Sequence, residues 1–295
     1  MTSERVEAAE VFFRSLQKSI LQSLERADGV GSFLSDPWEH PQKGGGITSV
    51  TQDGAIFEKG AVNFSSVVSK LEEDAAVRMN VSPQLISATG VSLILHPRNP
   101  LVPTVHANFR FLELENGDWW FGGGADLTPY YLFDDDVRHF HGVWKRVCDA
   151  HDPAYYPKFK GWCDRYFFLP HRGEARGVGG IFFDNLSGEF GPLFSFVRDC
   201  GSSFLDAYLP LVERRSRTRY SEDHRTWQLR RRSRYAEFNL LYDRGTKFGL
   251  DTGGRVESIF VSLPPVARWD YASEPAVGSE EERLLEVLRK PRVWV

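Results

Sequence analysis

Hydrophobic residues recur at helical spacing in several parts of the chain. Near the N-terminus, Phe13, Leu16, Ile20 and Leu24 fall on one helical face, and Asp28-Gly29 follows as a stop signal. These patterns predict helices over Ser3–Ala27, Ser65–Arg78, Asp134–Ala150, Ala154–Tyr166 and Leu193–Arg214, and a last helix that begins at the capping-box sequence Ser279-Glu280-Glu281-Glu282.

Other segments alternate apolar and polar residues with the period of two that is typical of strands. Asn116-Gly117 separates two of them and is a short hairpin signal. Because the strands cluster unevenly and do not alternate regularly with helices, the pattern favours an α+β fold with a large, mainly antiparallel sheet over a doubly wound one. The predicted strands are Gly90–His96, Val105–Glu113, Asp118–Gly124, Val178–Asp184, Tyr235–Asp243 and Arg255–Leu263.

The composition is that of a folded protein without a strong overall charge. The chain carries 36 Lys and Arg against 40 Asp and Glu, so its net charge of −4 gives no field that would attract polyanions. Its apolar runs are short beside the about 20 residues of a membrane helix, and we expect no membrane span. No repeat, low-complexity tract or linker divides the sequence, which predicts one domain over residues 1–295.

The N-terminal segment and the cysteines indicate a reducing compartment. Glu4 and Glu7 lie where a signal or transit peptide would be poor in acids, and no apolar signal core follows, so we expect a cytoplasmic protein. Cys148, Cys163 and Cys200 are odd in number and form no CxxC pair. They are expected to be reduced thiols packed in the core.

One predicted strand has a polar face with the residue types of a binding site. His106, Asn108 and Arg110 point to one side of Val105–Glu113, because strand side chains alternate. On an ordinary solvent-facing strand, Lys, Glu or Thr would be as probable as His, Asn and Arg. Both a solvent face and the wall of a polar cavity remain open, and the second is favoured.

The segment Tyr235–Asp243 gives a second polar face under the same alternation, with Glu237 and Asn239 on one side. Asp243-Arg244 ends it, and a Gly-Gly-Arg sequence opens the next predicted strand. Carboxylates and guanidinium groups at strand ends often build sites, although a salt-bridged turn explains them equally well.

Glycines precede Asp126 in the sequence FGGGADLTP, where missing side chains would let a ligand or the backbone approach an acid closely. Asp126 could equally cap a turn. The sequence holds no GxGxxG, GxxxxGK[ST], GxSxG or HExxH, so nucleotide binding, serine hydrolysis and zinc proteolysis have no motif behind them.

Two further groups invite a functional interpretation. His96, His106, His141 and His171 are scattered, and His141 lies on the apolar face of its helix, where a hydrogen-bonded core histidine is commoner than a metal ligand. The arginine-rich segment Arg214–Arg234 could bind nucleic acid. Acidic residues dilute it and no nucleic-acid motif accompanies it, which favours a solvated or interface surface.

A long stretch, KGWCDRYFFLPHRGEARGVGGIFFD (Lys160–Asp184), resembles the signature of the oxygen-dependent coproporphyrinogen III oxidase family, in its aerobic, bacterial-type form. The likeness extends through HPRNPLVPTVHANFRF (His96–Phe111), WWFGGGADLTPYY (Trp119–Tyr131) and YAEFNLLYDRGTKFGLDTGGRVESIFVSLPP (Tyr235–Pro265). It covers most of the chain from Gly90 to Tyr271.

This resemblance implies an enzyme that oxidatively decarboxylates two of the four propionates of coproporphyrinogen III to vinyl groups, with O₂ as co-substrate and CO₂ and hydrogen peroxide as products. Protoporphyrinogen IX, a haem precursor, would result. The substrate is itself electron-rich, so no organic cofactor is expected. The resemblance also implies a flat antiparallel sheet with helices on both faces, and a homodimer formed through Tyr235–Asp270.

The resemblance also assigns roles to individual residues. It implies that His106 is a proton donor, and that Asp126 and Asp243, together with Arg244, hold the pyrrole N–H groups and assist deprotonation. The implied substrate-binding residues are Ser92, Asn108, Phe109, Arg110, Gly253, Gly254 and Arg255. The implied ligands of a divalent metal, of unknown identity, are His96, His106, His141 and His171.

Two other functions stay open at this point. A non-catalytic tetrapyrrole carrier would keep Arg110 and Arg255 but would need no inward His and Asp groups. An RNA-binding protein that uses Arg214–Arg234 would show polyanion affinity that depends on salt.

Overall fold

A seven-stranded antiparallel sheet forms the centre of the protein in the computed structural model, which describes residues 3–71, 73, 76–77, 81–251 and 254–295. The order β1-β2-β3-β4-β5-β6-β9 follows the chain, with β7 and β8 outside this sheet, and every neighbouring pair is antiparallel. The strands are β1 (Leu34–Glu39), β2 (Lys43–Gln52), β3 (Phe57–Lys70), β4 (Leu85–Pro97), β5 (Thr104–Leu114), β6 (Trp119–Thr128) and β9 (Gly179–Leu186), with a small hairpin of β7 (Phe168–Leu169) and β8 (Glu174–Ala175).

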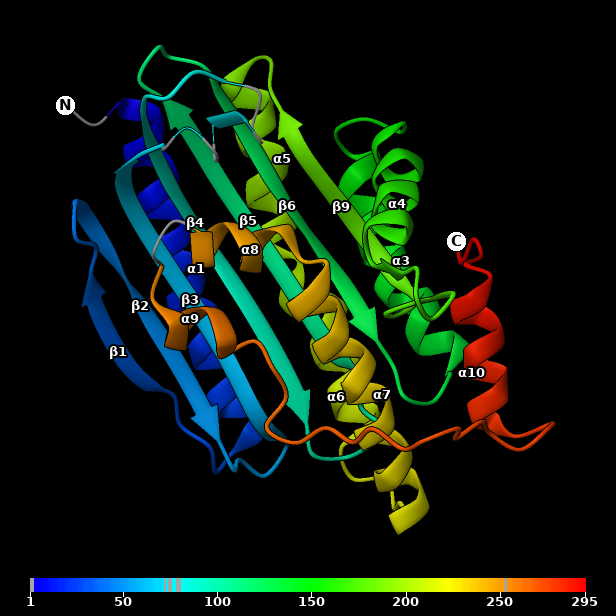
Figure 1. Cartoon of the computed structure of the whole chain (residues 1–295). Helices are drawn as coiled ribbons and strands as arrows, with labels where there is room; N and C mark the ends of the chain where they lie inside the picture. Colours follow the sequence, from blue (N-terminus) through cyan, green and yellow to red (C-terminus); the bar gives the residue numbers. More distant parts are fainter. Residues whose placement is uncertain (1–2, 72, 74–75, 78–80, 252–253) are drawn as a thin grey trace.

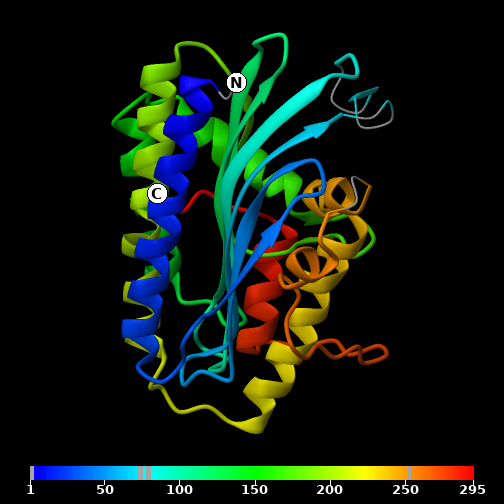
Figure 2. The same ribbon diagram turned by 90° about the vertical axis from the view of Figure 1, so that its left-hand side faces the viewer.

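Helices cover both faces of the sheet, which makes three layers (Figures 1 and 2). One face carries α1 (Glu4–Asp28), α3 (Asp134–Asp149), α5 (Phe190–Ser202) and α6 (Phe204–Arg215). The other carries α7 (Glu222–Leu241), α8 (Arg244–Asp251) and α9 (Val256–Phe260). The helix α4 (Tyr155–Tyr166) packs along the edge strand β9, and α10 (Glu280–Arg289) contacts β8.

The largest apolar core lies between the sheet and the helices α1, α3, α5 and α6 on one of its faces. Ser3 caps the start of α1 by accepting a hydrogen bond from the Val6 N–H, and Gly29 ends it with φ +75°. Phe13 of α1 is fully buried, as are Phe109 and Phe111, whose side chains lie on the same face of β5. Alternation along β5 therefore sends its phenylalanines into this core and its polar residues to the opposite face.

The opposite, polar face of the sheet is covered less completely. Tyr235 of α7 packs with Ala61, Ile94 and Val261. Ser258 of α9 lies 2.7 Å from the Thr48 hydroxyl. These contacts seat α7 to α9 over β2 to β4, while the polar side chains of β5 stay partly exposed.

The predicted fold class is confirmed: the protein is α+β, with a large antiparallel sheet between helices. Gly117 of the expected hairpin turn has φ +91° and joins β5 to β6. None of the helices that the described residues form is long and apolar enough to cross a membrane. The prediction of one domain over 1–295 stays a prediction.

Two predicted strands are wrong because they are helical. Tyr235–Asp243 belongs mainly to α7, and most of Arg255–Leu263 is the short α9 and its following turn. The polar and apolar residues of Tyr235–Asp243 alternate only over a short window. Ser221 caps the helix that runs into this window, and Tyr235, Phe238 and Asn239 are buried at helical spacing.

Other boundaries also differ. The predicted helix Ser65–Arg78 is strand up to Lys70, where β-branched Val67 and Val68 pair with both β2 and β4; much of its remainder lies outside the described residues. The predicted helix Leu193–Arg214 is two helices that meet at Ser203. The strands β1 and β2, and the part of β3 before Ser65, were not predicted.

Candidate functional site

The register of the sheet gathers polar side chains into one region on the face below α7. His106 of β5 is paired with Asp126 of β6, and Asn108 is paired with Ser92 of β4. Arg110 is paired with Gly122. The sequence predicted that His106, Asn108 and Arg110 share a face, and the structure confirms this.

The centre of this region is a chain of contacts from His106 to Arg176. The Nδ1 atom of His106 lies 2.9 Å from Asp126 Oδ1. One Arg176 nitrogen donates to both Asp126 oxygens at 2.8 and 2.9 Å, and the other donates to Asn239 Oδ1 at 2.8 Å. The side chains of Asp126 and Arg176 are each only 2% exposed, whereas that of His106 is 25% exposed. His106 is therefore the accessible end of a buried charged cluster.

This cluster keeps Asp126 ionised. Burial alone would raise the pKa of Asp126, but the Arg176 guanidinium and the hydrogen bond from His106 outweigh burial and lower that pKa. The ionised carboxylate behind the ring fixes which ring nitrogen of His106 faces it and leaves the other nitrogen for a bound molecule. The arrangement can hold a proton at His106 for transfer to a bound molecule.

Arg176 is a site residue that the sequence analysis did not single out. Its guanidinium lies over the rings of Phe167, Tyr235 and Phe238, with centroids at 4.1, 4.5 and 4.7 Å. Such an aromatic cage stabilises a buried cation. The sequence could have drawn attention to Arg176 because this residue lies inside the motif Lys160–Asp184. No local sequence pattern, however, connects Arg176 to Asp126.

A second charged group lies farther along β5. Arg110 is 2.9 Å from Asp184 of β9 and donates to Asn108 Oδ1 at 3.2 Å. Arg244 lies 3.7 Å from the other Asp184 oxygen. The glycine at 122 gives this pair its space, because a Cβ there would lie 2.6 Å from Asp184 Oδ1 and 2.7 Å from Arg110 Nε. Two partly exposed guanidinium groups therefore share one carboxylate, an arrangement that can accept a further anionic group.

Asp243 has a local structural role beside this group. Its Oδ2 accepts hydrogen bonds from the Thr246 N–H and hydroxyl at 2.7 and 2.9 Å, so it caps the start of α8. Its Oδ1 accepts from the Tyr166 hydroxyl at 2.9 Å. Asp243 therefore stabilises the turn into α8, and none of these contacts reaches Asp126.

The remaining predicted substrate residues divide between the two faces. Ser92 lies on the polar face between Asn63 and Asn108. The side chain of Phe109 points into the core beneath α1 and is 1% exposed, so only its backbone is available to a ligand. Arg255 precedes α9 and donates to Asp36 of β1 at 2.6 Å, next to Gly254. Gly253 lies outside the described residues.

The four histidines proposed as metal ligands are held by separate protein contacts. His96 is buried between the Ser262 carbonyl at 3.0 Å and the Thr104 hydroxyl at 3.4 Å. The two ring nitrogens of His141 lie 2.9 Å from the Tyr156 hydroxyl and 3.1 Å from the Val178 carbonyl. Burial is the main cause that lowers the pKa of His96 well below its usual value and that of His141 to about 3.

The last of the four, His171, lies between Glu237 and the Tyr242 hydroxyl, each at 2.8 Å. Within the described ranges of the chain, no group of three or more His, Cys, Asp or Glu side chains is placed to hold a metal ion. As they lie, His96, His106, His141 and His171 do not form one ligand set.

Several arginines of the segment Arg214–Arg234 form ion pairs with acids of other elements. Arg225 and Arg232 both contact Glu58, and Arg231 contacts Glu174. Arg231 and Arg232 are buried. The expectation of a solvated surface is therefore wrong for these two residues.

Comparisons with known proteins show the family of the chain. Residues 8–294 match the coproporphyrinogen III oxidase family. A protein of Francisella tularensis subsp. tularensis named oxygen-dependent coproporphyrinogen-III oxidase is 49% identical, over 99% of this chain and 99% of its own. One of Glycine max, named as the chloroplastic oxygen-dependent coproporphyrinogen-III oxidase, is 46% identical over 97% of this chain and 78% of its own. The chain belongs to the coproporphyrinogen III oxidase family.

Proposed function

We propose that this protein is an oxygen-dependent coproporphyrinogen III oxidase of haem biosynthesis. Each turn of the reaction converts one propionate, R–CH₂–CH₂–COOH, and one O₂ into a vinyl group, R–CH=CH₂, with CO₂ and H₂O₂. Two such turns give protoporphyrinogen IX. The substrate supplies the electrons that reduce O₂ to peroxide, so the balance needs no further reductant.

The observation that carries this proposal is the identity of 49% over 99% of both chains to a relative of that name. The polar face of the sheet supports it. Arg110 lies on β5, and Arg255 contacts Asp36 on β1. Four strand spacings of about 4.8 Å separate those strands, so the two guanidinium groups contact parts of the sheet that are about 19 Å or more apart. A flat tetracarboxylate would be held at both ends by such cations.

In this proposal, His106 and Asp126 move protons at the reacting propionate. The exposed edge of His106 faces the space where substrate binds, and Asp126 holds the ring and compensates its charge. Arg176 keeps Asp126 ionised and fixed. A contact of Asp126 with the pyrrole N–H groups of the substrate stays a prediction of the resemblance.

Arg110, with Asn108 and Ser92, would hold one propionate on the adjoining strands. Arg244, which contacts the same Asp184 carboxylate as Arg110, would hold a second propionate. The backbone of Phe109 and Gly254 would complete the wall, and a role of Gly253 stays a prediction of the resemblance. A direct role of Asp243 in holding pyrrole N–H groups stays a prediction. A divalent metal bound by His96, His106, His141 and His171 also stays a prediction of the resemblance, and no step above depends on it.

A homodimer through Tyr235–Asp270 is part of the proposal. This segment carries exposed apolar side chains, among them Leu240, Leu241, Val256 and Trp269. Burying them against a second copy would remove apolar surface from water. A cytoplasmic location stays a prediction of the sequence.

The experiment that tests the proposed function is an assay with coproporphyrinogen III in air and under strict anoxia. The proposal predicts product with two vinyl groups in air and none without O₂. A non-catalytic tetrapyrrole carrier would bind the substrate and leave it unchanged in both gases. An RNA-binding protein would show affinity for RNA that falls as salt rises and no turnover.

A further inference from the structure

An arginine-rich pocket of about 200 Å³ lies beside α7, between this helix, the β7–β8 hairpin and α10. Gln228, Arg232, Tyr235 and Asn239 form the stripe of α7 that packs toward the sheet and Arg176. The pocket is lined from a different stripe of the same helix. It is therefore separate from the polar face that holds His106. Its walls comprise Trp227, Arg230, Arg231 and Arg234 of α7, His171, Arg172 and Glu174 near the β7–β8 hairpin, Ser273 and Glu274, and Leu285 and Arg289 of α10.

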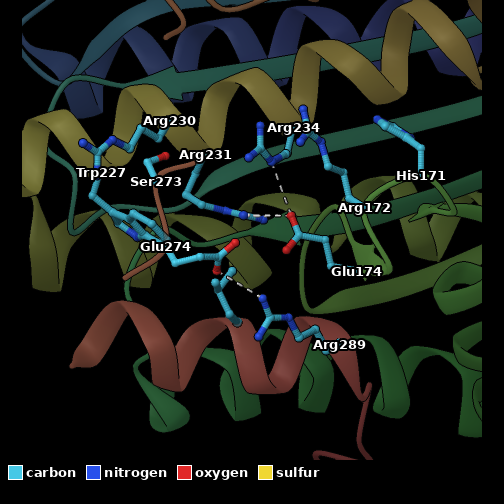
Figure 3. A pocket seen from close by; sticks show the side chains of 11 residues that line it. His171, Arg172, Glu174, Trp227, Arg230, Arg231, Arg234, Ser273, Glu274 and Arg289 are labelled. Carbon is cyan, nitrogen blue, oxygen red and sulfur yellow. Dashed lines mark hydrogen bonds and ion pairs between the residues drawn. The ribbon is translucent and has the colours of Figure 1, made fainter. Parts of the chain in front are cut away.

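The walls of this pocket carry more positive than negative groups. Figure 3 shows Arg230, Arg231 and Arg234 extending from α7, with Arg289 reaching from α10 on the other side. Five arginines in the walls face two glutamates. When the ion-pair partners just outside the walls are added, namely Glu237, Asp270 and Arg268, six guanidinium groups meet four carboxylates.

Arginines of the pocket share carboxylates, and within the described part of the chain one guanidinium donor is left without an acceptor. Glu174 is 2.8 Å from Arg231 and 3.7 Å from Arg234. The second terminal nitrogen of Arg231 is buried and, among the residues that the structure describes, has no hydrogen-bond acceptor. The Arg231 side chain is only 5% exposed. A buried charged donor without an acceptor is costly, and it leaves the positive charge of Arg231 only partly compensated in the wall of the pocket.

The lowered pKa of Arg234 indicates that the positive charges around it are not fully compensated by carboxylates. Burial and the like charges of Arg172 and Arg231 lower the pKa of Arg234, against the opposing pull of Glu237 and Glu174. A bound anion would reverse the effect of the neighbouring arginines.

We propose that this pocket binds a small polyvalent oxyanion, a phosphate or carboxylate compound with at least two negatively charged groups. Arg231, Arg234 and Arg289 would bind it from two helices, which would tie α10 to α7. The pocket is too small for a tetrapyrrole, and the proposal does not depend on the reaction proposed above.

Isothermal titration calorimetry on the full chain tests this, with inorganic phosphate, pyrophosphate and citrate as separate probes in 0.15 M NaCl. We expect binding at one site per chain. Arg289→Ala should weaken it about tenfold, since one charge-assisted contact is lost. The matched control is Arg283→Ala, on the same helix, similarly exposed and also paired with one acid, which should leave the affinity within about twofold.

A second variant separates binding from a merely structural role. Glu274→Gln breaks the same ion pair as Arg289→Ala but removes a negative charge from the wall, so it should tighten binding about two- to fivefold. Tighter binding of pyrophosphate than of citrate identifies a phosphate ligand, and the reverse order a carboxylate. Absence of one-site binding by all three probes, equal affinity in Arg289→Ala and wild type, or weaker binding in Glu274→Gln overturns the proposal.

Discussion

Arg176 and Asp126 form an ion pair that is almost wholly removed from solvent, with one guanidinium nitrogen 2.8 and 2.9 Å from the two carboxylate oxygens. The pair lies directly behind His106, which contacts the same carboxylate. A buried ion pair of this kind adds little stability compared with well-packed apolar residues. From its position behind an accessible histidine, we propose that the pair serves proton transfer at His106.

A charge-neutralising change at this pair should damage both stability and activity. Asp126→Asn leaves the Arg176 cation buried without its counterion, which should lower the free energy of unfolding by about 3–5 kcal/mol. Loss of the proton-transfer partner of His106 should lower kcat by about 10²- to 10⁴-fold. Urea unfolding and steady-state kinetics measure the two effects.

A double variant separates those effects. Asp126→Leu with Arg176→Met replaces the pair by apolar side chains and should recover most of the lost stability without recovering activity. If the double variant regains wild-type kcat, the pair is structural only.

Arg110 should bind a propionate through its planar fork. Arg110→Lys keeps the charge and loses the two-pronged geometry, and a charge-assisted hydrogen bond contributes about 1.5–3 kcal/mol, so kcat/KM should fall about 10- to 150-fold. A rise in KM alone would mean that Arg110 only holds the substrate. A fall in kcat as well would mean that it also places the reacting group.

Arg5 offers a matched control for that substitution. It has a similar exposed fraction and also lies 2.9 Å from one carboxylate, that of Glu113, but it belongs to α1 on the other face. Arg5→Lys should retain wild-type kinetics. Equal losses in the two variants would contradict the assignment of the polar face.

Gly122, which is paired with Arg110, should be needed for catalytic activity and not only for folding. In Gly122→Ala the new Cβ would meet both Asp184 and Arg110 closer than 3 Å, so their pair must move. A displacement of about 1 Å in a positioning group can cost about 10²-fold, and we expect kcat/KM to fall about 10- to 100-fold. Gly191→Ala, whose Cβ would meet nothing within 4 Å, should not alter kinetics. Unchanged kinetics in Gly122→Ala would show that the pair tolerates displacement.

The contacts of His141 lead to a prediction about metal content. Tyr156 and Val178 occupy its two ring nitrogens, so elemental analysis should find the same divalent-metal content in His141→Gln as in wild type. About one ion per chain in wild type and far less in the variant would instead support the four-histidine ligand set. In that case the chelated protein must be assayed for activity.

The sequence predicted those parts of the structure that depend on local pattern. The alternation along Val105–Glu113 placed His106, Asn108 and Arg110 on one face correctly, because a strand fixes side-chain direction residue by residue. The helix Asp134–Ala150 and the turn at Gly117 were likewise local. The first strands were missed because β2, with three glycines in succession, has a weak apolar pattern and is stabilised by its neighbours.

The rest of the site depends on contacts between distant residues. Arg176 reaches Asp126 across 50 positions, and Arg110 reaches Asp184 only because β9 joins the sheet beside β6. The alternation in Tyr235–Asp243 predicted a strand because a short window does not contain the cap at Ser221, where the helix begins. These features therefore depend on tertiary packing, which the sequence of one segment does not reveal.

The central claim is tested most directly by mixing the protein with excess coproporphyrinogen III under anoxia and then adding a limiting pulse of O₂. Mass spectrometry would count the propionates converted to vinyl groups, and a peroxide assay would count the H₂O₂ released. The account predicts no conversion before the pulse and, after it, one vinyl group and one H₂O₂ for each O₂ consumed. Vinyl product formed before O₂ is added, or substrate that stays bound and unchanged after the pulse, would contradict it.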